Sequence, residues 1–391
     1  MKLALKLAYR NLIGAGLRTW LNVIVLSFSF VIIIWLKGVL MGWDYQAKTD
    51  MKQWQIAEGQ WWHEAYDPFD PLSIQDSHAE LPNTITPLLE EGLTEPMLFV
   101  QASIFPEGRM QSVILKGIRP EQQLFRIPSI QLDTISEELP ALIGHMMAKS
   151  CRLKKGDIVT IRWRDANGTF DARDVVIAGV FASNVPAIEN AQVYIPLAEL
   201  QKMTLLTNQA TIISFSDEKL LKDPPTSWLS KDKAFLTKQV DEMIKTKSSG
   251  QTVMYIILLF LAMLAIFDTQ VLSIFRRQKE IGTYIALGYT RRQVVGLFTI
   301  EGSMHAVFAA FVGALYGVPF LSWQAKAGWT MPIDTSEFGM AIAQTLYPMY
   351  SLSLVFTTVF IVLLTTAIVS YLPSRKIAKM NPTEALRGKL Q

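Results

Sequence analysis

A short, positively charged stretch, residues 276–293, lies between two long apolar segments in the C-terminal half of the chain. These segments, residues 251–275 and 294–320, each exceed the ~20 residues that an α-helix needs to cross a bilayer. The stretch holds five Lys or Arg residues and one Glu. Such side chains dock onto partners or form ion pairs, and their clustering in a short loop marks the cytoplasmic side of a membrane. We therefore expect a cytosolic loop whose chemistry is binding rather than catalysis.

The loop also keeps the residue pattern of an amphipathic helix. Ile281, Tyr284 and Ile285 fall on one stripe of such a helix, whereas Lys279 and Glu280 fall outside it. This spacing predicts a short helix that lies against another surface in the cytosol. The alternative is an ordinary basic loop whose charges only set the membrane topology.

The order of residue types favours the first interpretation. Residues 277–288 read Arg-x-Lys-Glu-Ile-Gly-Thr-x-x-Ala-Leu-Gly, with Arg-Arg-Gln at 291–293 and Glu-Gly at 301–302. This order resembles the motif of the FtsX-like permease family, the membrane subunits of a class of ABC transporters that act on substrates outside the inner membrane. The resemblance implies a coupling helix that docks into a groove on a separate ATPase. The implied coupling residues are Arg276, Arg277, Lys279, Glu280, Ile281, Gly282, Ala286, Leu287, Gly288 and Arg291.

The C-terminal tail is similar to the end of the same family. Residues 373–387 read Pro-x-Arg-x-x-Ala-x-x-x-Pro-x-Glu-Ala-Leu-Arg. A basic tail that binds anionic lipid is the alternative interpretation. The tail residues that the resemblance singles out are Arg375, Pro382, Glu384, Ala385 and Leu386.

Composition places the chain in a membrane. Half of its 391 residues are hydrophobic, and the mean hydropathy is +0.25. The three expected cytosolic pieces, residues 1–18, 276–293 and 373–391, hold 14 Lys or Arg and 2 acidic residues, which leaves 23 basic and 32 acidic residues elsewhere. This asymmetry indicates a basic cytosolic face and an acidic exterior, and it argues against nucleic-acid binding.

The apolar runs predict an α-helical membrane protein with four transmembrane helices and a large α+β extracytoplasmic (periplasmic) domain between helices 1 and 2. The basic n-region of a signal peptide is an alternative for the first residues, but the apolar run that follows is too long and has no small-x-small cleavage site. The expected parts are a cytosolic amphipathic helix at 1–18, transmembrane helix 1 at 19–42, the α+β domain at 43–248, helix 2 at 249–275, the coupling loop at 276–293, helix 3 at 294–320, an exterior loop at 321–346, helix 4 at 347–372 and a cytosolic tail at 373–391.

The exterior domain is expected to hold several strands and a few helices. Residues 158–164 and 174–181 flank a turn and predict a hairpin. Helices are predicted at 142–150, 197–203 and 231–247. The other predicted strands span residues 98–105, 113–118, 193–195 and 211–215. The single cysteine, Cys151, cannot form an internal disulfide, so we expect it to be buried as a small apolar residue.

Two ionisable residues lie within the membrane segments. Asp268 and Glu301 would by default suggest a functional site at that depth. Both are close in sequence to the basic loop, so we expect ion pairs with its arginines, or snorkelling to the interface, instead. Gly313 and Gly317 form a G-x-x-x-G step, which predicts the close approach of another helix.

An aromatic and acidic patch opens the exterior domain. Its Trp54, Trp61 and Trp62 are candidates for contact with acyl chains or with a partner. A place in the core or at the membrane interface is the alternative interpretation.

Catalytic and nucleotide-binding patterns are absent from the sequence. It contains no G-x-x-x-x-G-K-[ST] loop, no G-x-S-x-G elbow and no histidine spacing of the H-E-x-x-H kind. We therefore expect no catalytic residue, no metal site and no cofactor on this chain, with ATP and Mg²⁺ bound by a partner ATPase.

Size and layout are most similar to the lipoprotein-releasing (Lol-type) permeases of the family. The resemblance implies a multi-pass protein of the bacterial inner membrane, with both termini cytoplasmic and a second permease copy or paralogue beside it. It implies that ATP hydrolysis moves the periplasmic domain, a mechanism called mechanotransmission, to release a lipoprotein or another outer-leaflet or periplasmic substrate. The alternatives are a signalling or scaffold protein that regulates a cell-wall enzyme, export of a peptide or small hydrophobic compound, and a membrane-anchored enzyme.

Overall fold

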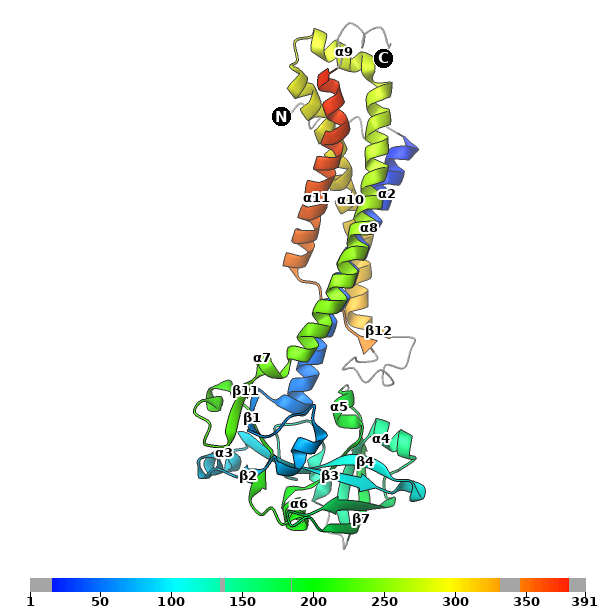
Figure 1. The fold of residues 1–391 in the computed structure, drawn as a ribbon. Helices are drawn as coiled ribbons and strands as arrows, with labels where there is room; N and C mark the ends of the chain where they lie inside the picture. Colours follow the sequence, from blue (N-terminus) through cyan, green and yellow to red (C-terminus); the bar gives the residue numbers. More distant parts are fainter. Residues whose placement is uncertain (1–15, 134–137, 184, 331–344, 380–391) are drawn as a thin grey trace. The chain divides into compact units, whose positions relative to one another are not determined.

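The structure is a computed structural model that describes residues 16–133, 138–183, 185–330 and 345–379 (Figure 1). The chain divides into two compact units. The first, here called the helical unit, comprises Met1–Gly42, Ile244–Trp329 and Tyr347–Gln391. The second, here called the β unit, comprises Trp43–Met243 and Thr330–Leu346.

Among the described residues, four helices are long and apolar enough to cross a membrane. They are α2 (Leu17–Met51), α8 (Lys238–Arg276), α10 (Arg291–Ala327) and α11 (Leu352–Ser374). Three of them run past their expected bounds by several residues, because polar residues at the ends of an apolar run continue the helix. As a result, α2 and α8 each contain residues of both units. The amphipathic helix expected at 1–18 lies almost entirely outside the described residues.

Small side chains set the packing inside the helical unit. Every fourth residue of α11 is buried, including Thr366 and Ser370, and this face packs against α10. The predicted close approach at the G-x-x-x-G step is confirmed. A Cβ atom built on Gly317 would lie 2.7 Å from the Val31 side chain of α2, and one on Gly313 would lie 3.4 Å from the Ser27 carbonyl.

The β unit is organised by one mixed sheet of nine strands in the order β11-β1-β10-β3-β4-β8-β5-β7-β6. Because the long strand β3 also pairs with β6, six of these strands form a closed ring, β3-β4-β8-β5-β7-β6. The remaining three strands, β10, β1 and β11, extend the sheet from the N-terminal part of β3, with which β10 pairs. The sheet strands are β1 (Gly59–His63), β3 (Thr94–Ile104), β4 (Gln111–Ile118), β5 (Leu139–Gly144), β6 (Ile158–Arg164), β7 (Phe170–Phe181), β8 (Gln192–Pro196), β10 (Ile212–Phe215) and β11 (Trp228–Asp232).

Shorter elements complete the unit. Two-residue strands form two small extra sheets, β2 with β9 and β12 with β13. The further elements are β2 (Ala79–Glu80), β9 (Gln209–Ala210), β12 (Trp329–Thr330), β13 (Thr345–Leu346), α3 (Thr86–Glu90), α4 (His145–Cys151), α5 (Pro186–Glu189), α6 (Leu197–Thr204) and α7 (Lys233–Leu236).

Successive side chains of the ring strands point to opposite faces of the sheet and so form two cores. In β4, Val113 and Leu115 point into a core inside the ring that includes Cys151, which is buried as expected. On the opposite face of the ring, residues such as Phe99 and Tyr194 belong to a second core. Long apolar side chains on both faces explain why this sheet folds without disulfides.

The coarse fold class expected from the sequence is confirmed: membrane-length helices are combined with a β-rich domain that also contains helices. The predicted hairpin is present as β6 and β7, and the helix predicted at 197–203 is present as α6. Two helix predictions were wrong in part. Residues 142–144 belong to strand β5, because this run is buried on both sides of the sheet. Residues 231–232 belong to strand β11, whose backbone pairs with β1.

The packing at Gly302 generates a first testable expectation. A Cβ atom there would lie 2.5 Å from the Ser370 Cβ and 2.8 Å from the Gln270 Nε2. Gly302→Ala should therefore lower the free energy of unfolding by about 1–3 kcal/mol, the usual cost of overpacking. Thermal unfolding in detergent micelles is the measurement.

Gly296 supplies the matched control in the same helix, because a Cβ atom there meets nothing within 4 Å. Gly296→Ala should keep or raise the midpoint, since alanine favours a helix over glycine by ~1 kcal/mol. Equal midpoints for the two variants would contradict the close approach of α8, α10 and α11 at Gly302.

Candidate functional site

Helix α9 (Gln278–Ala286) joins α8 to α10 within the helical unit. A single residue, Arg277, separates α9 from α8. After α9, Gly288 adopts a φ of +92°, a left-handed conformation that glycine takes at little cost and that ends a helix. Thr290 then caps α10 in a capping box with Gln293. These residues make the loop a helix, a turn and a second helix.

The apolar face of α9 is buried against three other segments. Ile281 is fully buried and packs in a cluster with Ile274 of α8 and Phe298 of α10. Ile377, in the 3-10 turn that follows α11, completes the cluster. The short amphipathic helix predicted from the sequence is therefore present, and it is attached to the ends of three membrane-length helices (Figure 1).

Arg277 fixes the junction between α8 and α9. Its Nη1 donates to both carboxylate oxygens of Glu301 at 2.7 and 2.9 Å, and its Nε donates to Glu280 at 2.7 Å. The guanidinium also lies over the Phe298 ring, 4.9 Å from its centroid. The expected ion pair between Glu301 and the basic loop is confirmed. A carboxylate that is almost fully buried thus has a charged partner, which such a group requires.

The opposite side of the α9 segment faces outward. Lys279, Thr283 and Ala286 are exposed on the helix, and Leu287 at its end is 72% exposed. Tyr289 in the turn is 40% exposed. Large apolar side chains that are held rigidly at the surface among basic residues are typical of a docking site for a partner.

The other predicted cytosolic and intramembrane residues are more dispersed. Arg276 and Arg291 are exposed at the helix ends beside α9, and Gly282 is buried on its inner face. Asp268 is exposed on α8. In the tail, the Arg375 guanidinium lies 5.9 Å from the centroid of the Tyr371 ring. Pro382, Glu384, Ala385 and Leu386 lie outside the described residues.

The aromatic patch of the β unit divides into two environments. Trp61 is buried in a core, where its Nε1 donates to the Leu221 carbonyl at 3.1 Å. Trp54 and Trp62 are only partly buried and line a cavity of about 1080 Å³. The core interpretation therefore holds for Trp61, whereas Trp54 and Trp62 pack against the second core and also border the cavity.

Lys116 lines the same cavity, and the sequence analysis missed it. It lies on β4, is 7% exposed, and its Nζ lies 4.5 Å from the centroid of the Phe99 ring. Burial lowers the pKa of the Lys116 ammonium from 10.5 to about 7. A lysine between apolar residues in a strand usually indicates the solvent side. Only the structure shows that this one is buried beside Phe99 and Tyr194, on the outer face of the ring.

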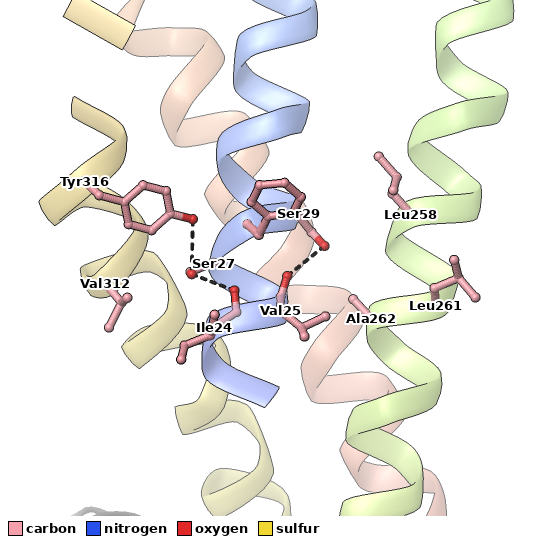
Figure 2. A pocket seen from close by; sticks show the side chains of 10 residues that line it. Ile24, Val25, Ser27, Ser29, Leu258, Leu261, Ala262, Val312 and Tyr316 are labelled. Atoms are coloured by element: carbon pink, nitrogen blue, oxygen red, sulfur yellow. Dashed lines mark hydrogen bonds between the residues drawn. The ribbon is translucent and has the colours of Figure 1, made fainter. Parts of the chain in front are cut away.

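The helical unit has an apolar pocket of about 550 Å³ between α2, α8 and α10 (Figure 2). Its hydroxyl groups are used internally: Ser27 donates to the Ile24 carbonyl at 2.8 Å and lies 3.2 Å from the Tyr316 hydroxyl. Ser29 donates to the Val25 carbonyl at 3.1 Å. The pocket therefore presents a hydrocarbon-like surface that suits an acyl chain or another apolar helix.

Within the described part of the chain, no group of three or more His, Cys, Asp and Glu side chains is arranged to hold a metal ion. The α9 segment has no nucleophile beside a general base.

Comparisons with known proteins agree with this architecture. Residues 252–382, which include α9 and most of α8, match the family model of the FtsX-like permease C-terminal domain. A macrolide export ATP-binding/permease protein, MacB of Chromobacterium violaceum, is 24% identical over 163 residues, which are 39% of this chain and 23% of that protein. An uncharacterised ABC transporter permease of Methanocaldococcus jannaschii is 27% identical over 168 residues, 40% of this chain and 39% of that protein.

The extracellular domain of the ABC-type transporter YknZ from Gram-positive bacteria aligns with 42% of this chain and 86% of its own, at 13% identity and a TM-score of 0.25. The chain spans well under half the length of each of the two relatives matched by sequence.

The described part of the chain thus combines four helices of membrane-spanning length with a β-rich domain. The resemblance expected from the sequence is confirmed over residues 252–382, which match the FtsX-like permease C-terminal domain.

The ion pair of Arg277 generates a second expectation. Arg277→Gln should lower the thermal unfolding midpoint in detergent, because it removes the guanidinium that pairs with the buried Glu301 carboxylate, a loss of about 3–5 kcal/mol for buried pairs. The neighbouring Arg276 is exposed, so Arg276→Gln is the matched control and should change little.

The double variant Arg277→Gln with Glu301→Gln completes a thermodynamic cycle. It should be more stable than the sum of the single effects predicts, because the two residues form one interaction. Additive effects would show that the two side chains do not interact.

Proposed function

We propose that this chain is the permease subunit of an ABC transporter and that α9 is its contact with a separate ATPase, which binds ATP and Mg²⁺. One observation carries the proposal. Helix α9 is clamped on one face by Ile281 and Arg277, while its other face presents Leu287 and basic residues to solvent. A helix fixed in this way can pass a displacement caused by a partner on to the helices that it contacts.

The route of transmission follows the continuous helices. Ile274, near the end of α8, packs in one cluster with Ile281 of α9. Helix α8 continues without a break to Lys238, inside the β unit, and α2 likewise contains residues of both units. A displacement of α9 would therefore reach the β unit through helical backbone, which supports mechanotransmission as the mode of action.

The proposed setting is the bacterial inner membrane, with α9 and both termini in the cytoplasm and the β unit in the periplasm. The basic charge of the loop supports this orientation. A second permease copy or a paralogue would complete the membrane part. In the apolar 18-residue stretch of α8, only 11% is buried within the chain, compared with 50% in that of α2. Helix α8 therefore keeps an apolar surface for lipid or for that partner.

For the cargo we propose a lipoprotein that is lifted from the outer leaflet of the inner membrane. The resemblance in size and layout to lipoprotein-releasing permeases supports this choice, as does a pocket that suits an acyl chain. A peptide or small hydrophobic compound, or a cell-wall enzyme regulated by the β unit, is the outcome if no lipoprotein is released.

The docking face can be tested by substitution. Leu287→Ala and Lys279→Glu should each reduce the amount of Walker-motif ATPase that co-purifies from native membranes, because each removes a contact of the exposed face. A loss of about tenfold in affinity is typical for an exposed apolar anchor at an interface. The measurement is quantitative mass spectrometry of the partner per tagged permease, after gentle detergent extraction.

Two exposed residues of the β unit serve as matched controls. Leu72 is 76% exposed and Lys155 is exposed, so Leu72→Ala and Lys155→Glu repeat the chemical changes elsewhere. Both should leave ATPase recovery unchanged. If all four variants recover the ATPase equally, or if no ATPase is recovered with the unaltered chain, α9 is not the coupling element.

A further inference from the structure

The cavity of the β unit combines an aromatic lining with one buried amine. Trp54, Trp62, Tyr66 and Tyr194 line it together with Lys116, which is 7% exposed. Its volume of about 1080 Å³ is at the upper end of the range for small-molecule sites. All of its lining residues belong to the β unit, so the site is built within one compact body.

Three other polar side chains of the cavity wall have hydrogen-bond partners within the chain. The Trp62 Nε1 donates to the Gln60 Oε1 at 2.8 Å, and the Gln60 Nε2 donates to the Ser214 Oγ at 2.9 Å. The Tyr194 hydroxyl donates to the Gln192 Oε1 at 2.8 Å. These three groups are therefore paired without a ligand.

Lys116 differs from these groups. Within the described residues no carboxylate pairs with it, and its Nζ faces only the rings of Phe99 and Tyr194, at 4.5 and 5.9 Å from their centroids. A buried ammonium without an anion is costly, and ring faces offset only part of that cost. An anion delivered by a ligand would supply the missing partner.

The remaining charges of the cavity lie nearer solvent. Glu64, Asp67 and Glu242 are exposed, as is Lys238. The partly buried Lys231 already stacks on an aromatic ring, with its Nζ 4.4 Å from the Phe235 centroid. The acidic residues at the outer part do not reach Lys116, so the deep end of the cavity favours an anion.

We propose that this cavity binds a small apolar organic anion, whose carboxylate pairs with Lys116 and whose apolar body stacks on the aromatic lining. The inference goes beyond the proposed function, because it does not depend on α9 or on an ATPase. It gives the β unit a ligand of its own, which is distinct from an acyl chain held in the membrane.

The test uses the full chain in lipid nanodiscs with two fluorescent probes, 1-pyrenebutyrate and its uncharged match 1-pyrenebutanol. Energy transfer from tryptophan to pyrene reports binding, because Trp54 and Trp62 line the cavity. The butyrate should bind saturably and more tightly than the alcohol. Lys116→Met should weaken the butyrate by about tenfold or more, the factor of a charge-assisted hydrogen bond, and leave the alcohol within about threefold.

Two further variants distinguish binding of the probe's carboxylate from binding of its apolar pyrene body. Phe235→Ala, at a half-exposed lining residue, should weaken both probes alike. Lys155→Met, at an exposed lysine of the same unit, should weaken neither.

Equal affinity of the unaltered protein for the two probes would overturn the proposal, even if Lys116→Met fails to fold. Equal weakening of both probes by Lys116→Met would also overturn it, because Lys116 would then be only a part of the core.

Discussion

The ion pair between Arg277 and the buried Glu301 is the interaction on which the α9 end of the helical unit depends. Glu301 lies on a helix long and apolar enough to span a membrane, where a carboxylate without a partner is strongly unfavourable. Arg277 satisfies it from the single residue between α8 and α9, with two hydrogen bonds of 2.7 and 2.9 Å. The position of α9 is therefore set by α10 as well as by α8.

The tight helix packing continues from this pair into the membrane-length helices. Gly302 directly follows Glu301 and has no room for a Cβ atom beside Ser370 and Gln270. The ion pair and the closest contact of α8, α10 and α11 thus lie at adjacent positions. The junction of α8, α9 and α10 is therefore tightly packed around both the charge and the small residue.

Much of this arrangement could be predicted from the sequence, and the reasons are physical. Long apolar runs need no tertiary information to indicate membrane-length helices, and the apolar stripe through Ile281 was enough to predict α9. The β6 and β7 hairpin was predictable because its pairing is local.

Strands β1, β5 and β11 were missed, because each is short and pairs with strands that are distant in sequence. The family resemblance pointed to the coupling residues, whereas nothing local in the sequence could show that β3 pairs with β6 and closes the ring.

Arg277 and Lys116 are two basic residues that are removed from solvent to different extents, and the charges around them give them different roles. The guanidinium of Arg277 is enclosed by two carboxylates and the Phe298 ring, so its environment is complete and its role is structural. The amine of Lys116 is more fully buried, but it faces only rings, in a cavity large enough for a ligand. A buried charge requires a counter-charge in either case. The described chain supplies a counter-charge to Arg277, whose role is therefore structural. It supplies none to Lys116, which is therefore the residue that we propose to bind the anion of a ligand.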